Sequence, residues 1–167
     1  VSAYAPGEHR PPKEKDAFWK ALYKHVQSTP SRYSTIIGGD FNAHVGHSEH
    51  TRHIGNSGAE EWNDNGEALS QFAVVMDLTI QNTFGPSSLT SWTWQKGDLS
   101  ARHRMDYFLV SPWLQHTINP ATRIDTDPVF QASTGHIDHR PIHLALRITH
   151  KFIHFQRPAR TRPPTTL

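Results

Sequence analysis

The sequence predicts a single folded domain of the α/β or α+β class. The chain has 167 residues, which is the usual length of one domain, and 35% of them are hydrophobic, so the chain can bury a core. Strand-like and helix-like segments follow one another, and several of the strand-like segments end in a polar group. Because polar side chains at strand ends are well placed for chemistry, we expect a functional site at one edge of the sheet structure.

The N-terminal part is predicted to contain a strand, a helix and a second strand. Val1–Tyr4 predicts a strand that ends at the turn over residues 5–7, which contains Pro and Gly. Apolar residues recur at helical spacing between Lys13 and Gln27, so we expect a helix there. The β-branched run Ser34–Gly38 predicts a strand that leads into a loop over residues 39–42.

The rest of the chain is predicted to contain a long loop, a helix and several strands. Residues 43–63 are rich in His, Gly, Ser and acidic residues and lack apolar periodicity, which indicates a loop beside the site. Asn65 is predicted to cap a helix in which Leu69 and Phe72 share an apolar face. Further strands are expected at Leu78–Thr83, Thr90–Gln95, Arg104–Val110 and Ile142–Ile148.

The charge is distributed unevenly along the chain. Residues 148–167 contain one Lys, three Arg and no acidic residue, which leaves 13 basic and 15 acidic residues in residues 1–147. We therefore expect a weakly acidic domain over 1–147, followed by a basic tail or linker that contains proline. The chain has no cysteine, so disulfides and thiolate zinc sites are excluded. No apolar run approaches the ~18 residues that a membrane span needs, so we expect no membrane insertion.

Polar groups suited to chemistry occur in segments that look like strand ends. They are Tyr4 in SAYAP, Asp40 and Asn42 in GGDFNAHVG, Asp106 in RHRMDYFLVS, and Asp138 with His139 in GHIDHRPI. Each has an ordinary explanation when taken alone, because an Asp after Gly often forms a turn, Asp106 could pair with Arg104, and an Asp-His-Arg run could be a solvated charged segment. Their occurrence together in one chain favours a functional site.

In their order and wording these segments resemble the endonuclease/exonuclease/phosphatase superfamily. Within it, GGDFNAHVG, NDNGEALSQFAVVMDLTIQNTF, SWTW and RMDYFLVS are most similar to LINE-type retrotransposon endonuclease domains of the apurinic-endonuclease-like kind, and to craniofacial-development-protein-2-like sequences. The resemblance covers residues 1–147. It implies a DNase I-like fold of the α+β class, a four-layered sandwich in which two mixed sheets pack face to face between helices, with the site at one edge.

The resemblance also implies a role in phosphodiester hydrolysis for each matching residue. Tyr4 would hydrogen-bond the scissile phosphate, although its side chain could instead be a core aromatic. Asp40 would orient or deprotonate the attacking water. Asn42 would hold the Asp40 carboxylate and a phosphate oxygen.

The remaining matches place an acid-bound histidine beside a metal ion. Asp106 would hydrogen-bond His139, set its tautomer and favour its protonated form, and His139 would point at the phosphate. Asp138 would lie beside Mg²⁺ or Mn²⁺, with Asp40 as a weaker second ligand. These residue types suit the chemistry, because carboxylates bind hard cations and an Asp-His pair supplies a positioned proton donor. No Ser or Cys nucleophile is needed, so direct attack by water fits best.

The sequence departs from the family pattern in two places. The family's Asn strand and its Glu strand, which carries the main metal ligand, precede the Tyr4 segment, and neither Glu8 nor Glu14 lies in a matching context. We therefore expect the chain to lack the first strands of the sandwich, to bind Mg²⁺ poorly and to be weakly active or inactive by itself. Ile137 stands where the family usually has Ser before Asp-His, which removes a hydroxyl near the site.

The function that the resemblance favours is metal-dependent DNA cleavage by an endonuclease domain of a retrotransposon-type protein. Such a domain would bind DNA, could be joined to a reverse transcriptase in its parent chain, and would be intracellular, or nuclear if derived from a retrotransposon. Two alternatives stay open, namely a degenerate domain that binds partners without catalysis and a phosphatase of small or lipid phosphates. The basic tail could contact nucleic acid, but an exposed linker to a following domain is favoured.

Histidine is frequent, with 13 residues in the chain. His44, His47, His50 and His53 recur at every third position, and a zinc cluster is one interpretation, because neutral imidazoles are good ligands. The Gly, Ser, Glu and Thr residues around them instead indicate a loop, in which a spacing of three does not align side chains. We therefore predict that these histidines do not form a metal cluster.

Overall fold

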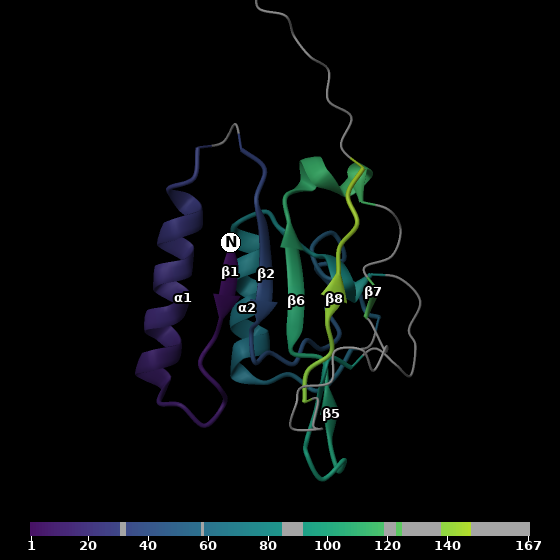
Figure 1. Cartoon of the computed structure of the whole chain (residues 1–167). Helices are drawn as coiled ribbons and strands as arrows, with labels where there is room; N and C mark the ends of the chain where they lie inside the picture. The colour runs from purple at the N-terminus through teal and green to yellow at the C-terminus, as the bar shows by residue number, and fades with distance from the viewer. Residues whose placement is uncertain (31–32, 58, 85–91, 119–122, 125–137, 148–167) are drawn as a thin grey trace, which may run out of the picture.

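The computed structural model describes residues 1–30, 33–57, 59–84, 92–118, 123–124 and 138–147. The predicted basic tail at 148–167 lies outside the described residues, and so does Ile137. Within the described part, helices and strands combine in one mixed α/β arrangement (Figure 1). This agrees with the fold class that the sequence predicts.

A four-stranded sheet forms the centre of the fold. Its strands are β1 (Ser2–Tyr4), β2 (Ile36–Asp40), β3 (Thr79–Ile80) and β6 (Asp106–Val110). They lie in the order β1-β2-β6-β3, with β1 parallel to β2 and the other pairs antiparallel. The sheet is therefore mixed, and strands far apart in sequence become neighbours.

The prediction of a strand over Ser34–Gly38 followed by a loop is wrong at its C-terminal end. Gly39 and Asp40 belong to β2, because they pair with Tyr107 and Asp106 of β6. The strand therefore carries Asp40 as its last residue, and the side chain is fixed by sheet pairing rather than by a loop.

Two helices, α1 (Pro12–Gln27) and α2 (Asp64–Val75), pack against the sheet and against each other. Pro at the start of α1 suits a first turn, whose N–H groups have no partner inside the helix. Asn63 caps α2, because its side-chain oxygen accepts a hydrogen bond from the Gly66 N–H at 2.8 Å. The prediction that Asn65 is this cap is therefore wrong, since Asn65 lies inside the first turn. In the described part of the chain, neither helix is long and apolar enough to cross a bilayer.

The core lies between the helices and one face of the sheet. Ile37 pairs with Leu109 across β2 and β6, and Leu109 pairs with Ile80 of β3, so the three side chains form a buried row. Trp19 of α1 joins this core, with its ring 6.2 Å from that of Phe41. Burying each such side chain contributes roughly 1.5–3 kcal/mol, so this core fixes the sheet register on which the site depends.

The remaining elements are short. The antiparallel hairpin of β4 (Trp94–Gln95) and β5 (Arg102–His103) projects below the central sheet in Figure 1. β7 (Arg123–Ile124) pairs with β8 (Ile142–His143), and the two 3-10 helices are Gln81–Thr83 and Pro112–Thr117.

Several predicted strands are shorter than expected. Leu78–Thr83 contains the two-residue β3 and then turns into a 3-10 helix. The strand predicted over Ile142–Ile148 ends at His143, although Leu146 makes an isolated bridge to Ile118. The first two residues of the predicted strand Thr90–Gln95 lie outside the described residues. Apolar alternation therefore marked the right places but overestimated how far backbone pairing extends.

Candidate active site

Three predicted site residues lie in one row across the central sheet. Tyr4 of β1 is in register with Asp40 of β2, and Asp40 is in register with Asp106 of β6. A Cβ at Gly39 would collide with the carbonyl oxygen of Ala3, so glycine is what allows β1 to approach β2 this closely. The row therefore depends on sheet pairing between segments that are remote in sequence.

A fourth predicted residue, His139, is brought to this row by the β4 hairpin. The segment around His139 bridges Trp94 in antiparallel fashion. The Gln95 N–H donates to the Asp138 carbonyl at 2.7 Å, and the Arg140 N–H donates to the Thr93 carbonyl at 2.7 Å. Backbone bonds on both sides therefore fix the position of the histidine.

His139 lies between two carboxylates. Its Nδ1 is 3.0 Å from Asp106 Oδ2, and its Nε2 is 3.8 Å from Asp40 Oδ2. The hydrogen bond to Asp106 raises the pKa of His139 above its ordinary value, against the effect of partial burial, and the charges of Asp106, Asp40 and Asp138 raise it further. The predicted Asp106-His139 pair is thus present, with Nδ1 turned to the acid and Nε2 turned toward Asp40.

Asp40 is held by backbone rather than by a side-chain amide. The Asn42 N–H donates to Asp40 Oδ1 at 2.8 Å, while the Asn42 side-chain Nδ2 donates to the Ala5 carbonyl at 2.9 Å. The expected bond from the Asn42 side chain to Asp40 is therefore wrong in its donor. Burial raises the pKa of Asp40, the Asn42 bond lowers it, and the nearby Asp106 charge raises it again.

Asn42 has a backbone conformation that needs support. Its φ of 47° lies in the left-handed region, which Asn tolerates better than most residues. The Asn42 carbonyl accepts a hydrogen bond from Asn63 Nδ2 at 3.0 Å, and Asn65 Nδ2 donates to the Pro6 carbonyl at 2.8 Å. The start of α2 therefore holds the loop that presents Asn42. Sequence reasoning predicted Asn65 only as a helix cap and did not single out Asn63.

Asp106 is held in place by two further residues, which the sequence did not single out. The hydroxyl of the fully buried Thr93 accepts hydrogen bonds from the Met105 N–H at 2.9 Å and the Asp106 N–H at 3.1 Å. Asn82 Nδ2 donates to the Asp106 carbonyl at 2.8 Å. Thr93 lies in the SWTW segment that carried the resemblance, so the motif was visible although its role was not.

Two ordinary explanations can now be rejected. Tyr4 is 76% exposed, so it is not a core aromatic. The buried Arg104 does not serve as the partner of Asp106, because its Nη1 donates to the carbonyls of Ser57 and Asn82, at 2.7 Å each. Asp106 is thus left to bind His139.

The site opens into a cleft of about 650 Å³. Tyr4 and Asn42 line the cleft, together with His9, Arg10 and His103. Asp138 is exposed, and its charge acts on both Asp40 and His139. Tyr4 and Asn42 are therefore the predicted site residues that the cleft exposes to solvent.

The donor set fits a hard divalent cation. Asp40, Asp106 and Asp138 act electrostatically on a single imidazole, so negative charge exceeds positive charge even when His139 is protonated. Asp40 Oδ1 is used by the Asn42 N–H, and Asp40 Oδ2 makes only the long ion pair to His139 among the interactions of the described residues. Carboxylate oxygens of this kind are what Mg²⁺ and Mn²⁺ prefer.

A second cluster of ionisable residues lies in the same region. His44, Glu60 and His103 each offer a ligand atom, and these atoms all lie within 4.8 Å of one another. Burial and the adjacent His103 lower the pKa of His44. Among the described residues, His47, His50 and His53 do not belong to this cluster. Glu60 and His103 were missed, because no sequence pattern connects them.

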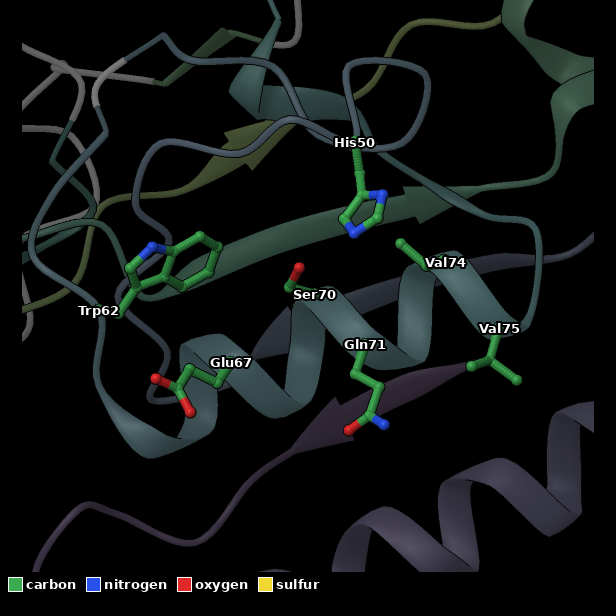
Figure 2. Close-up of a pocket in the computed structure, with 7 residues that line it drawn as sticks. All are labelled: His50, Trp62, Glu67, Ser70, Gln71, Val74 and Val75. Atoms are coloured by element: carbon green, nitrogen blue, oxygen red, sulfur yellow. The ribbon is translucent and has the colours of Figure 1, made fainter.

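A different pocket, of about 280 Å³, lies over α2. Figure 2 shows Glu67, Ser70 and Gln71 of the helix on one side of it, with His50 and Trp62 from the preceding loop on the other. None of the predicted site residues lines it. This pocket is therefore separate from the site at the sheet edge.

Grouped carboxylates and an acid-bound histidine at the end of a mixed sheet are typical of hydrolases of the nuclease or phosphatase type. Comparison with known families agrees with this class over most of the chain. The chain belongs to the endonuclease-reverse transcriptase family, whose model matches residues 1–143.

Known proteins resemble the chain in sequence and in fold. Craniofacial development protein 2 of Bos taurus is 30% identical over 129 residues, which cover 76% of this chain and 22% of that protein. The 3′-5′ exonuclease NExo from Neisseria meningitidis superposes with a TM-score of 0.63 at 20% identity, covering 88% of this chain and 60% of that chain. The endonuclease domain of TRAS1, a telomere-specific non-LTR retrotransposon, gives 0.57 at 21% identity, covering 87% and 54%.

One related structure includes nucleic acid. The 3′ phosphatase NExo from Neisseria, bound to a product DNA hairpin, gives a TM-score of 0.61 at 18% identity and covers 88% of this chain and 60% of that chain. These likenesses confirm the predicted DNase I-like fold class. The chain spans 22% of the length of the curated relative and less than two thirds of each solved chain.

Proposed function

We propose that the chain is a metal-dependent phosphodiester hydrolase whose substrate is DNA. The observation that carries the proposal is the alignment of Tyr4, Asp40 and Asp106 across the sheet, with His139 bound between the two carboxylates. Hydrolysis of a phosphodiester needs an activated water, stabilisation of charge on the phosphate oxygens and a proton for the leaving oxygen. Each need has a candidate group in this row.

Asp40 is the group that orients and deprotonates water. The Asn42 N–H fixes its Oδ1, so Oδ2 is the oxygen that faces the reacting water. The raised pKa of Asp40 makes this carboxylate a better proton acceptor than an ordinary exposed aspartate. The water attacks phosphorus directly, and no covalent enzyme intermediate is needed.

His139 supplies positive charge and a proton to the phosphate. Its raised pKa favours the protonated ring, and Asp106 holds Nδ1 so that Nε2–H is the free donor. Tyr4, which is exposed at the end of β1, is placed to donate its hydroxyl to a phosphate oxygen. Asn42 has a second side-chain N–H for the same purpose.

Asp138 and Asp40 are the residues that would hold a Mg²⁺ or Mn²⁺ ion. When bound, such an ion neutralises charge on the phosphate and on the leaving oxygen. The charges of both aspartates already act on the His139 imidazole, which supports their placement around one centre.

DNA is the substrate class that the cleft supports best. Arg10 and His9 line the cleft beside Glu8 and Glu14, and Arg10 forms an ion pair with Glu14. Outside the cleft lining, the guanidinium groups of Arg102 and Arg140 lie over the Trp92 ring at 4.9 and 3.1 Å from its centroid. Cationic side chains of this kind suit a phosphate backbone. The relatives named for endonuclease activity and for bound DNA support the same substrate class.

We propose further that the domain works inside a retrotransposon-type parent protein, joined to a reverse transcriptase and acting in the nucleus.

The proposal is tested by plasmid nicking in Mg²⁺ with the untagged chain and the variant Asp40→Asn. We expect slow nicking that Asp40→Asn abolishes and that the matched control Asp98→Asn, on the exposed hairpin, retains. The same proteins are assayed for phosphate release from a 3′-phosphorylated oligonucleotide and from inositol phosphates. Equal rates for the wild type and Asp40→Asn on every substrate would leave a non-catalytic scaffold as the better description, whereas a rate on inositol phosphates alone would favour the phosphatase.

A further inference from the structure

The cleft contains a second set of metal-ligating side chains beside the proposed hydrolase site. His44 follows β2, Glu60 precedes α2, and His103 ends β5, so three separate parts of the chain contribute. Their ligand atoms all lie within 4.8 Å of one another. Two of these residues, His44 and His103, line the same cleft as Tyr4 and Asn42.

Glu60 is anchored by bonds that leave one of its carboxylate oxygens turned toward the histidines. Glu60 Oε1 accepts the Arg104 N–H at 2.7 Å, and Oε2 lies 2.7 Å from His103 Nδ1. The Glu60 N–H donates to the Val45 carbonyl at 3.0 Å. The backbone of Glu60 and one of its carboxylate oxygens are therefore held in place, while the other oxygen faces the histidines.

The two imidazoles are held face to face. The ring of His44 stacks on that of His103 with centroids 4.1 Å apart and an angle of 15° between the planes, and the ring of Trp94 stacks against His103 at 5.9 Å. The His44 N–H donates to Asn63 Oδ1 at 2.8 Å, and the Thr93 N–H donates to the His103 carbonyl at 2.9 Å. Both ligands thus come from backbone that is fixed before any ion arrives.

A purely structural explanation accounts for only part of this arrangement. One hydrogen-bonded Glu60-His103 pair needs no second imidazole, and two stacked imidazoles repel each other whenever both are positively charged. The side chains of His103 and Glu60 are 32% and 24% exposed, so the cluster is open to solvent. A cation bound by all three groups would explain both why a second histidine is present and why the cluster is open to solvent.

We propose that His44, Glu60 and His103 form a binding site for Zn²⁺. Tetrahedral zinc with ligand bonds of ~2.0–2.1 Å places its ligand atoms about 3.3 Å apart, so the three groups must draw together from their present spacing. Because an imidazole binds an ion in the plane of its ring, one of the two stacked rings must rotate out of the stack when zinc binds. On binding, the ion replaces the proton between His103 and Glu60, and the proton leaves to solvent. Three protein ligands leave a fourth position, which a water or an anionic oxygen in the cleft fills.

The donor chemistry separates this site from the carboxylate site at the sheet edge. Two imidazoles and one carboxylate suit zinc, whereas Asp40 and Asp138 offer oxygen alone and suit Mg²⁺. The inference does not rest on the proposed hydrolysis of DNA. Zinc binding is therefore measured directly, without an activity assay.

The test uses the untagged full chain, stripped with a chelator and then titrated with ZnCl₂. Bound zinc is quantified by elemental analysis after dialysis, and tryptophan fluorescence follows the titration, because Trp94 contacts His103. We expect one zinc per chain and at least a tenfold loss of affinity in His103→Gln and in His44→Gln. The matched control His47→Gln, on the same loop but outside the cluster, keeps the affinity of the wild type. An excess of Mg²⁺ leaves the bound zinc in place.

Folding is checked by circular dichroism of each variant without zinc. If His103→Gln does not fold, Glu60→Gln carries the test, because its side-chain oxygen still accepts the Arg104 N–H. Substoichiometric zinc in the wild type would overturn the proposal. So would a loss in His47→Gln equal to the loss in the cluster variants, since the ion would then sit on the histidine-rich loop.

Discussion

Two histidine sites both contact Trp94, but their surroundings differ in charge. His139 lies between Asp106 and Asp40, so acids outnumber imidazoles and the pKa of His139 is raised. At the second site, His44 lies against another imidazole with one nearby glutamate, and burial together with that imidazole lowers its pKa. The same side chain is thus prepared to hold a proton in one place and to give an unprotonated nitrogen in the other.

The comparison teaches that the number of carboxylates around an imidazole decides its role more than its exposure does. Both histidines are half-buried. His139 donates a hydrogen bond from Nδ1 to the Asp106 carboxylate, which fixes its tautomer, whereas His44 has a ring stacked on its face. The predictions below separate the two sites, starting with the largest expected effect.

The largest effect is expected for His139→Gln. Removal of the proton donor should lower the rate of plasmid nicking by ~10²–10⁴-fold, the usual contribution of a positioned acid or base. Zinc content, measured in the same preparation, should not change. A nicking rate within a factor of about two of the wild type would contradict the role assigned to this ring. The exposed His47→Gln is the matched control for loss of one imidazole.

The second effect concerns the row of strand-end residues. In Gly39→Ala the new Cβ would meet the carbonyl oxygen of Ala3, so β1 must move away from β2. We expect the free energy of unfolding to fall by about 1–3 kcal/mol in urea melts. Gly97→Ala, which has no atom within 4 Å of the added carbon, should have no such effect. Zinc affinity in the folded variant should survive, because β1 contributes no ligand to that cluster. If both variants are equally stable, the tight strand pairing is wrong.

The third effect tests the buried support of Asp106. Thr93→Val keeps the shape of the side chain but removes the oxygen that accepts the Met105 and Asp106 N–H groups. Because those donors lose their partner, unfolding should become easier by about 1–3 kcal/mol in thermal or urea denaturation. The exposed Thr51→Val serves as the control. A stability equal to that of the control would show that these bonds are replaced by water.

The smallest expected effect is a change in titration. Asp106→Asn removes the negative charge and replaces the carboxylate with a weaker, neutral acceptor, so the pKa of His139 should fall in an NMR titration of the ring. In the wild type, folding favours the protonated ring, so this stabilisation is complete below the unfolded pKa and is lost as pH rises through the folded pKa. Asp106→Asn should therefore flatten this part of the pH dependence of stability. An unchanged His139 titration would mean that Asp106 does not set its charge.

Part of the site could be read from sequence because each residue lies in a recognisable strand-end segment. Asp40, Asp106 and His139 were predicted, and the structure brings them together. Their register could not be derived, since it depends on pairing between strands that are far apart along the chain. Gly39 shows the difference, because it was assigned to a loop although sheet pairing makes it part of β2.

Other features had no local signal at all. Glu60 meets His103 across 43 positions of sequence, and no periodicity marks either residue. Asn65 is a residue type that often caps helices, but the cap lies two positions earlier, at Asn63. Asn65 is instead buried, and its side chain donates to the Pro6 carbonyl. The histidine repeat includes His44. The histidine that stacks on His44, however, is His103, which belongs to a hairpin much further along the chain.

Trp94 touches both histidine sites. Its backbone bridges His139, and its ring stacks on His103. Because one residue contacts both histidines, a displacement of the β4 hairpin at His139 also displaces the ring that stacks on His103. The two sites are therefore mechanically linked, and an occupant that locks one of them also restricts the freedom of the second.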